Sequence, residues 1–248
     1  MDTASPKMTW KTFERRVAIY DDKVVKSEIS EEELIHRSDG SIVRPFWAKE
    51  RLQNEAATLE FISKNTSIPV PKYRLYSKDG LLHLETKFID GVELTEIDEA
   101  SRPTAIAAVH DQLTRTIIPQ LQALRRNSIG SVDPTLPVVP PQRVYMRDRR
   151  PWEKVTSDTD CFVLCHNDLG PQNILICPSS FQIVGIIDWE YAGYFPSYFE
   201  IPLWKTVGWK ERWEVYHEAE ARELAFFGLK REDLKDCVPP PLENTKIN

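Results

Sequence analysis

Residues 165–176 read Cys-His-Asn-Asp-Leu-Gly-Pro-Gln-Asn-Ile-Leu-Ile, and a second stretch, Ile187-Asp188-Trp189-Glu190, begins fourteen residues after Asn173. The first stretch has the spacing His-x-Asp-x-x-x-x-Asn, formed by His166, Asp168 and Asn173. Residues 174–176 and 182–187 are apolar and largely β-branched, and Cys177-Pro178-Ser179-Ser180 between them predicts a turn. Together they predict a β-hairpin with the two stretches at its open end.

This hairpin predicts a cluster of three polar side chains. A hairpin brings its two open ends together, so Asn173 and Asp188 should lie side by side, far from the turn. Asp168 lies on the loop that leads into the first strand, and it should converge on the same edge. A carboxylate and an amide oxygen suit Mg²⁺ when phosphates complete its coordination shell. A second carboxylate can accept the proton of an attacking hydroxyl, so the cluster predicts phosphoryl transfer.

The segments before the hairpin predict a small, sheet-rich lobe. Two β-branched runs within residues 13–26 flank a turn at Asp21-Asp22, and residues 73–89 predict a second hairpin that turns at 78–80. Apolar residues at helical spacing predict a helix over 45–64 between the two hairpins. We therefore expect an N-terminal lobe over residues 1–90.

The composition changes at Asp90-Gly91 from strand-like to helical. Helices are predicted over 103–126 and from about 197 to 236, with a proline-rich extended excursion over 127–151 and a frayed tail at 239–241. Residues 91–248 should therefore form a larger, helical C-terminal lobe that carries the catalytic loop. The fold class predicted is α+β, with two lobes, a small antiparallel sheet in the first and mostly helices in the second.

Composition excludes several classes of protein. The 248 residues carry a net charge of −6, which argues against a nucleic-acid binder and is compatible with a cationic small-molecule substrate. The longest apolar runs are too short to cross a bilayer, and the N-terminus lacks the apolar segment of a secretory signal. The four cysteines form no CxxC pair, which indicates a reducing compartment, most simply the cytosol. The sequence does not specify the oligomeric state.

The two motifs resemble those of the aminoglycoside phosphotransferase and choline kinase group of protein-kinase-like enzymes, closest to its fungal branch. The resemblance continues through Asn54-Glu55-Ala56, Ile68-Pro69-Val70-Pro71 and residues 88–94, and covers roughly residues 15–205. It implies transfer of the γ-phosphoryl group of ATP to a hydroxyl or an amine of a small molecule, with Mg²⁺. Asp168 would be the catalytic base, Asn173 and Asp188 the metal ligands, and His166 the residue that holds the catalytic loop.

The resemblance also implies the residues that bind the nucleotide. Glu55 matches a helix glutamate that pairs with a strand lysine, and Lys26 is the first choice for that lysine, with Lys23 and Lys49 as alternatives. The adenine would meet the backbone of the linker at Lys87, Phe88 and Ile89.

Two features depart from this family pattern. The chain has nine glycines, of which Gly40 is the first, so the hairpin at 13–26 has no glycine-rich loop and its Asp21-Asp22 turn would repel phosphate. A long charged insert, residues 28–50, separates Lys26 from Glu55. Two alternatives therefore stay open: a pseudokinase used for binding or scaffolding, and an enzyme that performs acid–base chemistry on a small metabolite without a nucleotide. Trp204, Trp209 and Trp213 suit a core stripe or one wall of a substrate pocket.

Overall fold

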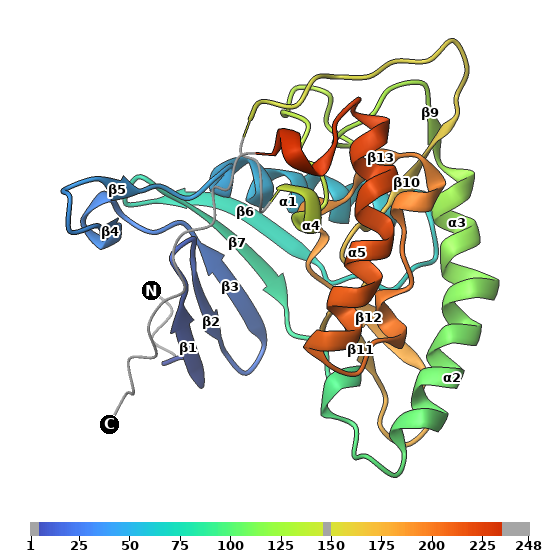
Figure 1. The fold of residues 1–248 in the computed structure, drawn as a ribbon. Coiled ribbons are helices and arrows are strands. Elements are labelled where there is room, and N and C mark those ends of the chain that lie inside the picture. The colour runs from blue at the N-terminus through green and yellow to red at the C-terminus, as the bar shows by residue number, and fades with distance from the viewer. Residues whose placement is uncertain (1–4, 146–149, 235–248) are drawn as a thin grey trace.

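The computed structural model describes residues 5–145 and 150–234, which form a sheet-rich lobe and a helical lobe (Figure 1). The first lobe is an antiparallel sheet with the strand order β1-β2-β3-β7-β6. Its strands are β1 (Met8–Lys11), β2 (Arg16–Ile19), β3 (Lys23–Ser27), β6 (Tyr73–Lys78) and β7 (Leu81–Lys87). Helix α1 (Ala48–Asn65) packs Leu52 and Ala56 against Leu82 and Leu84 of β7. Both predicted hairpins and the helix between them are confirmed.

Strand β1 was absent from the predicted elements. Its residues Met8-Thr9-Trp10-Lys11 alternate apolar and polar side chains, but all four are exposed, so the strand has no buried face. The insert over residues 28–50 forms a short 3₁₀ turn and a small hairpin of β4 (Ile35–His36) and β5 (Ile42–Val43). Figure 1 shows this hairpin at the end of the sheet away from the helices of the second lobe.

The second lobe combines helices with two small antiparallel sheets, ordered β12-β11-β8 and β13-β10-β9. Its elements are β8 (Val92–Glu93), α2 (Arg102–Gln112), α3 (Ile118–Ala123), β9 (Arg125–Arg126), α4 (Gln142–Tyr145), β10 (Phe162–Cys165), β11 (Ile174–Ile176), β12 (Ile183–Ile186), β13 (Gly193–Phe195) and α5 (Trp209–Phe226). Its core extends into the first lobe, because Leu59 and Ile62 of α1 belong to the same buried cluster as Val109, Leu113 and Phe199. This shared core fixes the sheet-rich lobe against the helical one.

The prediction of one long helix over residues 197–236 is wrong. The chain there forms 3₁₀ turns at Ser197–Phe199 and Leu203–Lys205, then α5, then a further 3₁₀ turn at Arg231–Asp233. Pro202 has no backbone N–H, and Gly208 precedes α5 in an extended conformation, so both interrupt a continuous helix. The tail at 239–241 lies outside the described residues.

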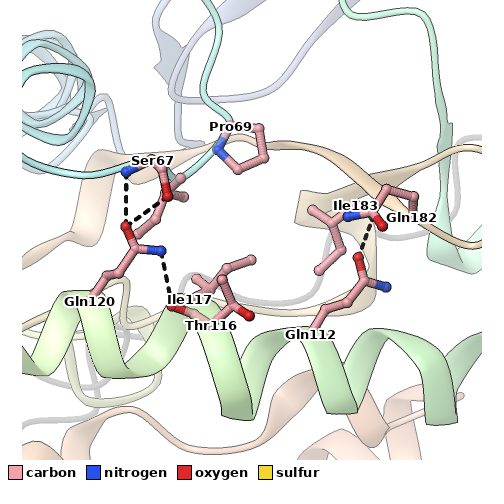
Figure 2. A pocket seen from close by; sticks show the side chains of 9 residues that line it. Ser67, Pro69, Gln112, Thr116, Ile117, Gln120, Gln182 and Ile183 are labelled. Atoms are coloured by element: carbon pink, nitrogen blue, oxygen red, sulfur yellow. Dashed lines mark hydrogen bonds between the residues drawn. The ribbon is translucent and has the colours of Figure 1, made fainter.

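The helix predicted over 103–126 is divided by a π-helical turn at Leu113–Ile117, and the chain turns extended at Leu124. Beside this turn lies a small cavity (Figure 2), where Gln120 accepts a hydrogen bond from the Ser67 amide at 2.8 Å. Gln112 accepts one from the Ile183 amide at 2.9 Å. These glutamines connect the helices to the segment after α1 and to β12, so they position the predicted hairpin.

The sequence also predicts that the chain has no membrane-spanning segment and that its cysteines are unpaired. None of the described helices is long and apolar enough to span a bilayer. Cys161, Cys165 and Cys177 are free thiols, and Cys237 lies outside the described residues. Buried Cys165 packs within the main core cluster, where a cysteine behaves as a small apolar residue.

Candidate active site

The β11–β12 hairpin brings its two ends together as the sequence predicts. Ile174 pairs with Ile186, and the Ile187 amide donates to the Asn173 carbonyl at 3.0 Å. Asp188 follows directly, in a left-handed conformation with φ +65°. Such a conformation is unusual for a residue with a Cβ, and at a strand end it re-aims the side chain. Asn173 and Asp188 therefore lie next to each other at one edge of the sheet.

Asp168 joins this pair through Asn173. The Asn173 Nδ2 group donates to the Asp168 carbonyl at 2.8 Å and to its Oδ2 at 3.2 Å. These bonds do not use the Asn173 amide oxygen, which is the atom that can ligate a metal. Burial raises the pKa of Asp168 to about 6, against the opposing charge of Arg212. A carboxylate with this pKa is suited to accept a proton near neutral pH.

His166 holds the catalytic loop in place. Its ring is fully buried, Nε2 lies 3.0 Å from the Ile187 carbonyl, and Nδ1 lies 3.3 Å from the Asp168 amide nitrogen. Burial lowers the pKa of His166 to about 4, so the ring is neutral at physiological pH. The ring thus connects the loop before Asp168 to the strand end before Asp188.

Lys26 connects the two lobes. Its Nζ lies 2.9 and 2.8 Å from the two carboxylate oxygens of Glu55 on α1, and 2.6 Å from Oδ1 of Asp188. Burial alone would lower the pKa of Lys26, but Asp188 and Glu55 outweigh it and hold the pKa above its ordinary value. Burial opposes ionisation of Asp188, yet the Lys26 charge lowers the Asp188 pKa to about 2. Lysine and aspartate are therefore both charged.

The alternative lysines lie elsewhere. Lys23 is 3.6 Å from Glu85, and Lys49 is exposed on α1. Burial raises the pKa of Glu55 to about 7, against the Lys26 charge. The structure thus brings Lys26, and neither of the other two, to Glu55.

The predicted adenine linker is partly occupied by the protein's own hydrogen bonds. The Lys87 amide donates to the Lys72 carbonyl at 2.8 Å, and the Phe88 amide donates to the Asp22 carbonyl at 2.8 Å. Ile89 packs on Gly185 so closely that a Cβ there would lie 2.5 Å from the Ile89 Cδ1 atom. In this conformation neither the Lys87 nor the Phe88 amide is available to a base.

Sequence reasoning missed the turn that lies over the site. The β1–β2 turn closes through a bond from the Thr12 amide to the Arg15 carbonyl at 2.9 Å, with no glycine. Arg15 is buried and its Nη2 lies 2.5 Å from Glu190, two residues beyond Asp188. The prediction assigned the glycine-loop position to Asp21-Asp22. The alternation of apolar and polar residues over Met8–Lys11 is the signal that could have indicated this earlier hairpin.

A second missed residue is Arg212 on α5. Its Nη2 lies 2.5 Å from Asp168 Oδ1, its Nη1 donates to Gln172 at 2.8 Å, and its Nε donates to the Tyr216 hydroxyl at 2.7 Å. The residue is 44 positions from Asp168 in the sequence. No local pattern could have connected them.

Arg143 on α4 supports the catalytic loop from behind. It forms a bidentate pair with fully buried Glu223 of α5 and donates to the Asn167 carbonyl at 2.7 Å and to the Phe199 carbonyl at 2.6 Å. Glu200 accepts a bond from the His166 amide at 2.5 Å. The loop is thus fixed by side chains from α4, α5 and the segment after β13.

Asn173 and Asp188 could bind a cation such as Mg²⁺ only if a bound ligand supplied further oxygen atoms. Within residues 5–145 and 150–234, no group of three or more His, Cys, Asp and Glu side chains could hold a metal ion. Asn173 and Asp188 supply one amide and one carboxylate, the kind of partial set that Mg²⁺ uses together with phosphates and water. The residues present fit such a shared site.

A family model described as the phosphotransferase enzyme family matches residues 41–228. Solved aminoglycoside phosphotransferases share the fold over 91% of this chain. A thermostable apo mutant of APH(4)-Ia is 15% identical with a TM-score of 0.53 over 81% of its chain. A ternary complex of APH(2″)-IIa with streptomycin and ATP is 11% identical with a TM-score of 0.51 over 84% of its chain. APH(4)-Ia itself is 14% identical with a TM-score of 0.51 over 83% of its chain.

A curated relative, the ATP-dependent DNA helicase II subunit 2 of Chaetomium globosum, is 30% identical over 88 residues. The match covers 35% of this chain and 12% of that protein's length. The likeness is therefore confined to a small part of the larger protein.

Proposed function

The chain belongs to the phosphotransferase enzyme family, and from this premise we propose that it transfers the γ-phosphoryl group of ATP to a hydroxyl or an amine of a small molecule. The observation that carries the proposal is the Lys26 ammonium, which Glu55 holds 2.6 Å from Asp188. A cation fixed between the lobes, beside a carboxylate and an amide, can neutralise phosphate charge where a metal would bind.

Asn173 and Asp188 would hold Mg²⁺, which when bound neutralises the phosphate oxygens and fixes their orientation. Lys26 would move from Asp188 toward the phosphates, since it keeps Glu55 as its second partner. Arg15, on the turn above the same edge, adds a second cation beside Glu190. These groups bind and orient the triphosphate without a glycine-rich loop.

Asp168 would take the proton of the acceptor. The acceptor oxygen forms its bond to the γ-phosphorus while the bond from that phosphorus to the ADP oxygen breaks, and the hydroxyl proton passes to Asp168. Its pKa of about 6 leaves the carboxylate ionised at neutral pH and ready to accept this proton. Asn173 fixes the same carboxylate through its amide group.

One observation favours a pseudokinase as the second candidate. Asp168, Asp188 and Glu190 each have a cationic side chain within 2.6 Å, from Arg212, Lys26 and Arg15. A site neutralised in this way could bind a ligand and never turn it over. A nucleotide-independent acid–base enzyme would use Asp168 alone, so its turnover would not depend on ATP.

Release of phosphate from γ-labelled ATP, with water as acceptor, distinguishes these functions. We expect a Mg²⁺-dependent rate in the wild type that falls by about 100-fold or more in Asp188→Asn and in Asp168→Asn. Asp79→Asn is the matched control, because Asp79 is an exposed residue in the turn between β6 and β7. No turnover in the wild type, or an unchanged rate in Asp188→Asn, would contradict the proposed function.

A further inference from the structure

Arg212, the cationic partner of the proposed base Asp168, has N–H groups that form no hydrogen bond with any other residue that the structure describes. A guanidinium has five N–H groups, and Arg212 uses three of them, toward Asp168, Gln172 and the Tyr216 hydroxyl. The three bonds fix the plane of the group, and its side chain is 24% exposed. Arg212 is therefore a preorganised anion-binding group that faces solvent next to the base.

Aromatic side chains lie near Arg212 along α5, and the guanidinium lies 5.4 Å from the centroid of the Tyr216 ring. Trp209 and Tyr216 stand at i−3 and i+4 from Arg212 and therefore share its face of the helix. Trp213 is the next residue along the helix, at the border of that face, and packs edge-on against His217. Trp209 is 74% exposed and Trp213 is 47% exposed. The prediction of a core stripe is thus wrong for these two, since Trp204 alone of the three tryptophans is buried.

An exposed apolar patch often marks a binding surface, because apolar area in contact with water is unfavourable unless a partner covers it. Val207, which is 51% exposed, extends the apolar area at the start of the helix. In Figure 1 this orange end of α5 is drawn beside β11 and β12, and the Arg212–Gln172 bond confirms that it lies against the catalytic loop. The part of α5 that carries Trp209, Arg212 and Trp213 therefore lies next to the catalytic loop that contains Asp168.

Arg212 is paired with Asp168, and further cationic and acidic side chains stand near this face. Lys210 lies 5.9 Å over the Trp209 ring and adds a second cation. Glu211, the nearest acidic neighbour in the sequence, turns back to accept a bond from the Val207 amide at 2.6 Å. The overall charge of −6 is compatible with a cationic acceptor, and the Asp188 and Glu190 carboxylates act on Asp168 together with Arg212 and Arg143. The preference for an anion therefore rests on the two N–H groups that Arg212 does not use toward Asp168, Gln172 and Tyr216.

We propose that Arg212, Trp209 and Trp213 form the acceptor subsite, and that it selects a hydroxyl compound with an anionic group next to the hydroxyl and an aromatic or apolar body. Arg212 holds the anionic group, the tryptophans cover the apolar body, and the hydroxyl reaches Asp168. This inference rests on the proposed function, because it identifies the acceptor of the same reaction. Arg212 is thus a specificity-determining residue and Asp168 the base.

Two probes of similar size and opposite charge test the inference. 3-Phenyllactate carries a benzyl group, a hydroxyl and a carboxylate, and phenylalaninol carries a benzyl group, a hydroxyl and an ammonium. We expect calorimetric titration to give 3-phenyllactate at least tenfold tighter binding. Arg212→Gln should abolish this preference and Arg212→Lys should retain part of it. Arg222→Gln is the matched control, since Arg222 lies on the same helix and donates to the Tyr198 carbonyl.

Separate variants test whether Trp209 and Trp213 bind the apolar part of the acceptor. Trp209→Ala and Trp213→Ala should weaken 3-phenyllactate more than lactate, which lacks the ring, while Trp10→Ala on exposed β1 should change neither. Equal or tighter binding of phenylalaninol to the wild type, or no binding of either probe, would overturn the inference. ATP hydrolysis in the same preparations separates the two proposals. Hydrolysis without the charge preference overturns the subsite, and the preference without hydrolysis overturns the proposed function.

Discussion

His166 stabilises the fold in a way that depends on pH. Its pKa falls from 6.5 in the unfolded chain to about 4 in the folded one, because the ring is buried. Between these values the unfolded chain binds a proton that the folded chain does not, so folding becomes less favourable as pH falls. Over the interval from pH 7 to pH 4 the loss from this group is about 3 kcal/mol.

The prediction is tested with urea unfolding at several pH values. His166→Gln should be less stable than the wild type at pH 7 and should lose less stability between pH 7 and pH 4. His36→Gln is the control, since His36 is exposed on β4. Parallel loss in the wild type and in His166→Gln would show that the ring is not buried in its neutral form.

Lys26 is the side chain on which nucleotide binding should depend most. Its replacement by methionine leaves Glu55 and Asp188 without their shared cation, where the phosphates would bind. We expect Lys26→Met to weaken ATP binding at least tenfold by calorimetry. Lys23→Met, on the same strand but paired with Glu85, should change it less than twofold. Equal effects of the two variants would show that Lys26 has no special role.

Helices α4 and α5 are connected by a buried ion pair whose removal has a predictable cost. Arg143 and Glu223 are both buried, and Arg143 also holds the catalytic loop through the Asn167 carbonyl. Arg143→Met leaves an unpaired carboxylate in the core, and should cost about 3–5 kcal/mol of unfolding free energy.

The double variant Arg143→Met/Glu223→Leu separates the charge from the packing. It should recover a substantial part of the loss, because no buried charge is left without a partner. Urea unfolding of the single and double variants measures the difference. A double variant that is no more stable than the single one would indicate that the loop contacts of Arg143, rather than its charge, dominate.

The elements with a clear periodic pattern could be predicted, and those without one could not. Helix α1 and the β6–β7 hairpin bury one face, so apolar residues recur at the matching spacing. Strand β1 does alternate apolar and polar residues over Met8–Lys11, but all four are exposed, so the alternation marks no buried face. The segment over 197–208 forms successive 3₁₀ turns, whose short length leaves no period to detect.

The residues of the candidate site likewise fall into those that the sequence could predict and those that it could not. Asn173 and Asp188 could be placed together because a hairpin connects them, and Asp168 because it lies on the adjoining loop. Arg15, Arg143 and Arg212 reach the site only through tertiary packing, from a turn and two helices far away in the sequence. Their roles depend on contacts that no local pattern encodes.

Lys26 and Glu55 belong to the sheet-rich lobe, whereas Asp168, Asn173 and Asp188 belong to the helical one. Mg²⁺ with ATP should therefore bind residues of both lobes at once. Such a ligand binds the folded chain alone, and at a hundredfold excess over its dissociation constant it should stabilise the fold by about 2.7 kcal/mol.

Thermal unfolding of the wild type and of Asp188→Asn, each with and without ATP and Mg²⁺, measures this directly. We predict a rise in the melting temperature that requires both ATP and Mg²⁺, is absent in Asp188→Asn and is retained in Asp79→Asn. A rise of equal size in Asp188→Asn, or no rise in the wild type with any nucleotide, would contradict the assignment of this site as a nucleotide-dependent phosphotransferase centre.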